Sequence, residues 1–367
     1  MTRAAVMRAI GSPLEILEVD VLPPKSHEIV VQLAASGVCH SDLGTLNGSL
    51  ARLPCPMVLG HEGAGVVTDV GPGVTKFSPG DHVVLASAPK CGNCFWCMNG
   101  QPTLCEVIVI LAKGGLLDGT PRFQLDGAPL HQLSFTGTFS EVTVVPDIAA
   151  TRIPLDMPLV PAALLGCGVV TGYGAATRIA DIHPGSTVAV VGCGGVGLSA
   201  IQGAKAAGAR RIFAIDVVPT KLDLARTFGA TDALLINGVE TIRAVRKLTD
   251  DRGVDVGIDA SGNLEAISLM ISMTRKGGEC VFVGMPGFEA VLPLELQRSL
   301  ISAQRTFKGC VYGGIDIEVD VAHMVASYQE GRLLLDELVS RQIGLEDVND
   351  ALQSMASGEV GRSVVVF

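Results

Sequence analysis

Four closely spaced cysteines are the residues of this chain whose types and spacing predict chemistry most clearly: Cys91, Cys94, Cys97 and Cys105. The pattern C-x2-C-x2-C-x7-C lets four thiolates converge on one tetrahedral centre, which is the shell that zinc prefers. A cluster of buried thiols is the alternative, and a disulfide framework is disfavoured by the acidic chain and by N-terminal residues that are typical of a short strand. Four protein ligands leave no open position, so we expect a structural zinc here and the reaction elsewhere.

A glycine-rich turn predicts a nucleotide site in the second half of the chain. An apolar strand, 187–191, runs into the turn, and a helical pattern follows it; the turn consists of Gly192, Cys193, Gly194, Gly195, Val196 and Gly197. In a dinucleotide fingerprint the first glycine makes the tight turn, the second lets the backbone approach a pyrophosphate, and the last lets helix and strand pack closely. Asp216 ends the next strand, where a carboxylate would accept hydrogen bonds from ribose hydroxyls and repel a 2′-phosphate, which favours NAD over NADP. The alternative for the glycines is an ordinary strand-to-helix turn, and the alternative for Asp216 is a cap at the end of its strand.

Three scattered residues are candidates for a second, open metal site. Cys39 and His61 stand in polar clusters beside strand patterns, and Cys167 lies far downstream. Two cysteines and one histidine would leave a fourth position for water or substrate, as a catalytic zinc requires. Taken singly they are weak signals, because a lone cysteine is usually a buried small hydrophobe and a lone histidine usually a structural residue.

Composition restricts the class of protein. The chain has 367 residues, enough for two domains, with 48% hydrophobic residues and 44 glycines, as an α/β protein with many tight turns would have. Its net charge of −10 and the absence of a Lys/Arg run disfavour nucleic acid and anionic membranes as partners. The sequence contains no uninterrupted apolar stretch of about 18 residues, so we expect no membrane span. We expect a cytoplasmic location, where ten cysteines indicate metal or thiol chemistry.

The two halves differ in their patterns. Residues 1–160 show β-type alternation with Gly/Pro turns, as at 28–34 and 63–70, which predicts an antiparallel, barrel-like domain. Residues 107–136 are expected to be a long, mostly irregular segment with a functional or interface role. From 186 onward, apolar strands alternate with helical patterns, which predicts a parallel sheet covered on both faces. The strands are expected at 187–191, 211–216, 233–236, 254–259 and 279–284, with helices at 221–228 and 239–248.

The last strand, 362–367, is expected to return to the first domain. The predicted domains are therefore 1–167 with 310–367, and 168–309.

Several segments together resemble the zinc-dependent medium-chain alcohol dehydrogenase family. The motifs are G-V-C-H-S-D at 37–42, G-H-E-G-A-G-V-V at 60–67, the four-cysteine lobe, G-C-G-V-V-T-G-Y-G-A at 166–175 and G-C-G-G-V-G at 192–197. They occur in the family's order over nearly the whole chain, and the long 107–136 segment is similar to the animal-type and glutathione-linked branches. The resemblance implies an α/β fold, with a GroES-like antiparallel β-rich catalytic domain and a Rossmann doubly wound parallel-sheet cofactor domain. It also implies two zinc ions per chain and NAD as cofactor.

The resemblance also implies a role for individual residues. Cys39, His61 and Cys167 would hold the catalytic zinc, with Asp42 orienting His61 and Glu62 behind the metal. Ser41 would accept the proton of the alcohol, and His40 would contact the pyrophosphate. Thr171 would lie near the nicotinamide, and Lys221 would contact the ribose. A helix-surface position without a role is the alternative for Lys221.

Several positions depart from the best-known members of the family. Gly44 replaces the histidine that ends the proton relay, and Val365 aligns with a C-terminal arginine that pairs with the pyrophosphate, while Arg362 nearby is expected to point elsewhere. Ser87 replaces an aromatic residue that narrows the pocket, and Val109 replaces an arginine that grips the carboxylate of glutathione. Three further positions expected at the pocket are small or flexible: Leu133, Ser134 and Met285. We therefore expect a wide pocket that accepts bulky primary alcohols.

The resulting hypothesis is a zinc- and NAD-dependent enzyme that reversibly oxidises alcohols to aldehydes or ketones, assembled as a homodimer or homotetramer. Alternatives within the same fold are a formaldehyde dehydrogenase acting on a thiol adduct other than that of glutathione, and an enzyme that holds its nicotinamide tightly. A non-enzymatic cofactor-binding protein is disfavoured because Cys39, Ser41, His61 and Cys167 are all retained. A zinc-finger nucleic-acid binder is disfavoured because Lys90 is the only basic residue near the cysteine run.

Overall fold

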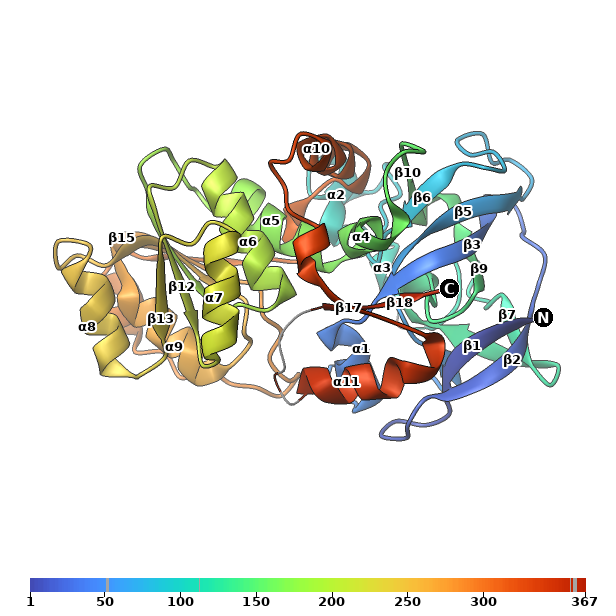
Figure 1. The fold of residues 1–367 in the computed structure, drawn as a ribbon, viewed down its shortest axis with the longest axis horizontal. Coiled ribbons are helices and arrows are strands. Elements are labelled where there is room, and N and C mark those ends of the chain that lie inside the picture. Colours follow the sequence, from blue (N-terminus) through green and yellow to red (C-terminus); the bar gives the residue numbers. More distant parts are fainter. Residues whose placement is uncertain (51–52, 112, 357, 359–361) are drawn as a thin grey trace. The chain divides into compact units, whose positions relative to one another are not determined.

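The computed structural model describes residues 1–50, 53–111, 113–356, 358 and 362–367. Two compact units divide the chain: Met1–Cys167 together with Asp316–Phe367, and Gly168–Ile315 (Figure 1). The first unit is rich in antiparallel strands, and the second contains a parallel sheet with helices around it.

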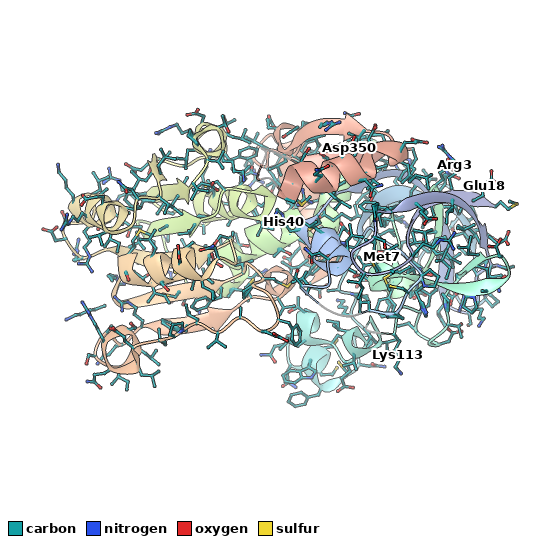
Figure 2. All side chains as sticks on the ribbon, turned by 90° about the horizontal axis from the view of Figure 1, so that it is seen from below. Arg3, Met7, Glu18, His40, Lys113 and Asp350 are labelled. Carbon is teal, nitrogen blue, oxygen red and sulfur yellow. The ribbon has the colours of Figure 1, made fainter. Side chains whose placement is uncertain are left out.

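A small closed barrel forms one part of the first unit. Its strands follow the order β1 (Thr2–Met7), β2 (Glu15–Val21), β7 (Phe123–Leu125), β8 (Ala128–Gln132) and β4 (Met57–Val58). Arg3 and Glu18 are cross-strand neighbours on β1 and β2 and lie close together in Figure 2. Alternate residues of β1 point inward, and the interior is filled by apolar side chains from several strands: Ala4, Val6, Val19, Val58, Phe123 and Leu130.

The segment 107–136 is not the mostly irregular stretch that its sequence suggests. It contains the short helix α3 (Ile108–Leu111) and the hairpin of β7 and β8, and β7 pairs with β2. The hairpin turns at Asp126 and Gly127, whose φ values are +52° and +76°. Two consecutive left-handed residues of this type form the turn that suits the twist of a two-residue hairpin, so Asp-Gly is the signal that specifies these strands.

One buried arginine attaches this hairpin to the rest of the unit. Arg122, which directly precedes β7, donates from Nε to Glu28 Oε2 at 2.7 Å and from its terminal nitrogens to Asp118 and Thr120. Its side chain is 1% exposed and that of Glu28 is 7% exposed. The planar guanidinium satisfies its donors with fixed partners, so a buried charge is tolerated at this position.

A mixed sheet completes the first unit. Its strands run in the order β10 (Ala150–Ile153), β6 (His82–Leu85), β5 (Glu62–Val70), β3 (Glu28–Gly37), β18 (Arg362–Val366) and β17 (Val339–Ile343), while β9 (Val142–Pro146) also pairs with β3. The final strand β18 is antiparallel to β3, so the C-terminal tail returns to this sheet as predicted. A neighbouring core combines both ends of the chain, since Met7 and Val38 pack in one cluster with Val348 and Val365.

Short helices connect the strands of the first unit. The α-helices are α1 (His40–Leu46), α2 (Phe95–Met98), α3, α4 (Leu159–Ala163), α10 (Ile317–Gln329) and α11 (Val348–Ala356). The tighter 3-10 turns are Pro102–Leu104, Leu133–Phe135, Asp147–Ala149, Leu164–Gly166, Asp336–Leu338 and Leu345–Asp347.

The second unit is built on a parallel sheet. Its strands follow the order β13 (Asp232–Leu235), β12 (Arg211–Asp216), β11 (Thr187–Val191), β14 (Val254–Asp259), β15 (Thr274–Phe282) and β16 (Thr306–Gly309). The predicted strands 187–191, 211–216 and 254–259 coincide with β11, β12 and β14. The strand order reverses between β11 and β14, which is where a doubly wound sheet opens a crevice at its carboxyl edge.

Helices surround this sheet (Figure 1). They are α5 (Gly168–Gly174), which continues into a π-helical turn at Ala175–Ile179, α6 (Gly195–Ala206), α7 (Pro219–Thr227), α8 (Val239–Lys247) and α9 (Leu264–Met273), with further turns at Leu296–Ile301 and Tyr312–Gly314. In the described part of the chain no single helix is long and apolar enough to cross a membrane; one bent pair, Leu159–Gly166 with Gly168–Ile179, meets those criteria by length and composition only.

Candidate metal centre and nucleotide site

The start of helix α1 carries two residues of the predicted metal site. Cys39 directly precedes the helix and is buried, and Asp42 lies fully buried in its first turn. Asp42 Oδ2 accepts a hydrogen bond from the backbone N–H of Cys39 at 3.0 Å. A carboxylate at this place also suits the unpaired N–H groups and the positive dipole at a helix N-terminus. The bond fixes the backbone that carries the Cys39 thiol.

The same carboxylate orients His61. Asp42 Oδ1 lies 2.9 Å from His61 Nδ1 and accepts the backbone N–H of Gly60 at 3.0 Å. Donation from Nδ1 to a carboxylate leaves the lone pair on Nε2, which is the usual arrangement of a metal-ligating imidazole. His61 Nε2 is buried and has no hydrogen-bond partner among the residues that the structure describes. A buried polar atom normally has one, so this atom fits a metal ligand.

Cys167 reaches this place through close backbone packing. A Cβ atom on Gly166 would lie 2.7 Å from the carbonyl oxygen of Leu85 and 3.0 Å from Glu62 Cα, so only glycine allows the approach. Ligand atoms of Cys39, His61, Glu62 and Cys167 lie within 4.8 Å of one another. Two sulfurs and one imidazole nitrogen form a donor set that suits a zinc with one open position. The three predicted ligands are therefore brought together, with Glu62 beside them.

A buried ion pair stands directly behind this cluster. Arg362 Nη2 donates to Glu62 Oε2; the Glu62 side chain is fully buried and the Arg362 side chain is 9% exposed. Burial raises the pKa of Glu62 to about 7, although the charge of Arg362 opposes the shift. A Cβ on Gly37 would lie 2.2 Å from Glu62 Oε2, so this glycine makes room for the carboxylate.

Arg362 is absent from the residues that the sequence predicts for this site, and its side chain lies against Glu62. Its signal is a single basic side chain in a final strand that is otherwise largely apolar. A buried guanidinium needs a buried counter-charge. Val365, the position aligned with the family arginine, is fully buried in the apolar core.

The two thiols of the cluster differ in acidity. A hydrogen bond from Cys167, assisted by the charges of His61 and Arg362, holds the pKa of the Cys39 thiol well below its ordinary value despite complete burial. Zinc binds the thiolate form of cysteine, so this arrangement favours metal capture.

The four-cysteine run forms a separate cluster. Sulfur atoms of Cys91, Cys94, Cys97 and Cys105 lie within 4.8 Å of one another, and all four cysteines are free of disulfides. Cys94 precedes helix α2, and hydrogen bonds from the backbone N–H groups of Glu106 and Cys97 lower the pKa of its thiol to about 6. Four thiols this close together fit a structural zinc with no open position.

The glycine-rich turn adopts the geometry of a phosphate-binding loop within the second unit. Gly192 has φ of +91°, and a Cβ on Gly197 would lie 1.7 Å from the Gly192 carbonyl oxygen, so both positions require glycine. A Cβ on Gly194 would meet no atom within 4 Å, which is the open side on which the fingerprint places a pyrophosphate. Gly195 and Val196 form the first turn of α6, whose N–H groups suit an anion.

Asp216 connects the glycine-rich turn with strand β12 through hydrogen bonds. It ends β12, is 6% exposed, and accepts the backbone N–H of Cys193 at 2.7 Å and that of Val218 at 2.9 Å. Each carboxylate oxygen keeps a lone pair for a further donor such as a ribose hydroxyl.

The remaining predicted residues are placed on helices. His40 is the exposed first residue of α1 (Figure 2), and Ser41 follows it half-buried. Thr171 lies on α5 and Lys221 on α7, both half-buried. Their roles toward a cofactor stay predictions.

Two family models match the chain. Residues 25–155 match the model described as alcohol dehydrogenase GroES-like domain, and residues 195–327 match the one described as zinc-binding dehydrogenase. The predicted α/β fold with a GroES-like domain and a Rossmann-type domain is confirmed.

Relatives match along the full length. A protein of Escherichia coli O157:H7 named S-(hydroxymethyl)glutathione dehydrogenase is 39% identical over 369 residues, covering 100% of both chains. Among solved structures, an alcohol dehydrogenase zinc-binding domain protein from Burkholderia ambifaria superposes with a TM-score of 0.94 at 33% identity, covering 100% of this chain and 98% of the other. Benzyl alcohol dehydrogenase from Acinetobacter calcoaceticus gives 0.93 at 28% identity, with coverage of 100% and 99%.

Proposed function

This chain belongs to the zinc-dependent medium-chain alcohol dehydrogenase family, and on that basis we propose that it uses NAD to oxidise bulky primary alcohols reversibly to aldehydes. The family uses zinc and NAD. The observation that carries the proposal is the buried cluster of Cys39, His61 and Cys167, in which His61 Nε2 lacks a hydrogen-bond partner in the described part of the chain. A non-enzymatic relative would have no use for such a costly buried donor set.

Each residue of the candidate site would have a separate role in alcohol oxidation. Cys39, His61 and Cys167 would hold a zinc ion that, when bound, acts as a Lewis acid on the substrate oxygen. Asp42 holds His61 in the tautomer that presents Nε2 inward. Ser41 stands one residue before Asp42 on α1 and would accept the alcohol proton. Because Gly44 offers no side chain on the next turn, the proton would pass from Ser41 through a ribose hydroxyl to water.

The cofactor proposal rests on Asp216. Its carboxylate is held by the backbone of both the glycine turn and the β12 end, so it is positioned before any ligand arrives. A fixed negative charge beside the ribose would favour the hydroxyl of NAD and repel the phosphate of NADP. His40, Thr171 and Lys221 would supply the pyrophosphate, nicotinamide and ribose contacts.

Replacing Asp216 by glycine should shift the coenzyme preference toward NADP. The variant loses charge-assisted hydrogen bonds to the ribose, so the ratio of kcat/KM for NAD to that for NADP should fall about tenfold or more. Steady-state kinetics with both coenzymes measures the ratio. Asp223→Ala, at an exposed acid on the same α7 region, is the matched control and should leave it unchanged. An unchanged ratio in Asp216→Gly would remove the ribose role of this carboxylate.

The substrate proposal rests on residues that the family resemblance places at the substrate pocket. The backbone N–H of Ser87 bonds to the carbonyl of Gly166, next to Cys167, so a serine stands where a larger side chain would narrow the site. Leu133 and Ser134 lie on the 3-10 turn after β8, and Ser134 is held at φ of +53°. These features favour a wide pocket. The Acinetobacter relative named for benzyl alcohol is consistent with an aromatic substrate.

A specific observation favours a second candidate substrate, because the 39%-identical relative is named for S-(hydroxymethyl)glutathione. Against it, Val109 is 75% exposed and uncharged where a glutathione-gripping arginine is expected. With NAD, benzyl alcohol should show kcat/KM about tenfold or more above ethanol, since each additional buried group adds binding energy. S-(hydroxymethyl)glutathione should be the poorer substrate. The highest kcat/KM for the glutathione adduct would replace our proposal with the second candidate.

Three further expectations stay predictions. They are release of free NADH during turnover, a homodimer or homotetramer, and a cytoplasmic location. Rapid dilution of the enzyme during a fluorescence assay of NADH would detect a tightly held cofactor, and light scattering of the purified protein would reveal a monomer.

A further inference from the structure

A buried acid ends the central strand β14 of the second unit. Asp259 is fully buried, and its Oδ1 accepts the backbone N–H of Ser261 at 3.0 Å and the Ser261 hydroxyl at 2.6 Å. Oδ2 accepts the backbone N–H of Gly262 at 3.2 Å. The Ser261 oxygen in turn accepts the N–H of Asn263, which caps helix α9. One carboxylate therefore orders the whole turn between β14 and α9.

The same residue connects this turn with the one after β15. The backbone carbonyl of Asp259 accepts N–H groups from Val283 and Gly284 at 2.9 and 3.0 Å. A Cβ on Gly284 would lie 2.1 Å from the backbone nitrogen of Gly262 and 2.8 Å from Asp259 Oδ2. The two turns touch backbone to backbone, with the carboxylate between them.

This pair of turns also contacts the glycine-rich turn. The N–H of Ala260 bonds to the carbonyl of Val191 at 2.8 Å, and a Cβ on Gly192 would lie 2.9 Å from the backbone nitrogen of Ser261. Asp259 therefore ends β14 directly beside Val191, the last residue of β11, where the strand order reverses. A dinucleotide binds across that crevice, one mononucleotide on each half of the sheet.

We propose that Asp259 is a positioning residue that holds the turns after β14 and β15 in place for the nicotinamide half of the cofactor. The Gly192 turn and Asp216 belong to the half of the sheet formed by β11, β12 and β13, which leaves β14, β15 and β16 for the other nucleotide. The inference rests on the proposed function, because it requires a nicotinamide dinucleotide. Asp259 need not touch the ligand and acts through the backbone that it orders.

The test compares two ligands on the full-length protein carrying Asp259→Asn. NADH spans both halves of the sheet, whereas ADP carries only the adenosine and pyrophosphate. In the variant an amide N–H would face the N–H of Ser261 or Gly262, so one turn must lose a hydrogen bond. NADH affinity, from its fluorescence, should fall about tenfold. ADP affinity, from calorimetry, should stay within about twofold of the wild type.

Matched variants separate positioning from general stability. Asp255→Asn lies on the same strand at its opposite end, where Asp255 bonds to Thr187 and Arg275, and it should leave the NADH affinity unchanged at 25 °C. Ser261→Ala removes the 2.6 Å bond and should weaken NADH in the same direction if Asp259→Asn fails to fold. Equal loss of NADH and ADP affinity, or no loss of NADH affinity, would overturn the inference. Failure of the wild-type protein to bind NADH would instead contradict the proposed function.

Discussion

Cys39→Ser is expected to abolish hydride transfer and to leave about one zinc per chain. Serine is a poor zinc ligand, and the buried position of Cys39 offers no replacement from solvent. Loss of a residue that only orients a ligand costs about 10–100-fold in metal affinity or activity, so the loss of a ligand itself should exceed about 100-fold. The measurements are NADH formation with benzyl alcohol and zinc content by atomic absorption on the same preparation.

The four-cysteine cluster supplies the matched control. Cys94→Ser is the same chemical change at a thiol whose cluster has no open position, so it should also remove about one zinc. It should lower the melting temperature while the folded fraction keeps most of its turnover. Undiminished turnover in Cys39→Ser, or loss of turnover in both variants without thermal destabilisation of the second, would contradict the division into catalytic and structural metals.

The parts of these sites that the sequence predicts are those that depend on local geometry. Cys91, Cys94 and Cys97 are close in sequence, so their convergence requires only a few turns of backbone. The Asp42–Cys39 bond is likewise a contact between residues three apart at a helix start, which a capping pattern specifies. Strands β11, β12 and β14 were predictable because fully apolar runs bounded by turns admit few alternatives.

Long-range partners were less predictable. Glu62 and Arg362 are 300 residues apart, and nothing in either local pattern sets the register of β18 against β3. A run such as Val364–Val366 has no alternation, so its pattern fits the observed register and a register slipped by one residue equally well, although the slip would exchange the two faces. The β7–β8 hairpin was missed for a different reason, since its Asp126–Gly127 signal stands within a segment whose other turns mask the strands. The Asp259 network was unpredictable for the same reason, because its carboxylate and its backbone carbonyl accept hydrogen bonds from two different loops.

Breaking the Arg362–Glu62 pair should produce the largest loss of stability at the candidate site. Arg362→Met removes the guanidinium and leaves a fully buried carboxylate without its counter-charge. Removal of one partner from a buried ion pair costs about 3–5 kcal/mol of unfolding free energy. Without Arg362 the pKa of Glu62 rises above about 7, so the carboxyl must either stay charged without solvation or take up a proton that the unfolded chain does not bind. Urea unfolding of the zinc-loaded protein, followed by circular dichroism, measures the change.

A double-mutant cycle with Glu62→Gln isolates the interaction. The double variant Arg362→Met/Glu62→Gln should be more stable than the Arg362→Met single variant, since a neutral amide is cheaper to bury than an unpaired carboxylate. A coupling energy of about 2 kcal/mol or more is expected for two groups in direct contact. Arg243→Met, which breaks an exposed pair with Glu240, is the control and should cost less than about 1 kcal/mol. Additive single variants would mean that the pair, although buried beside the metal ligands, does not hold β18 and β5 together.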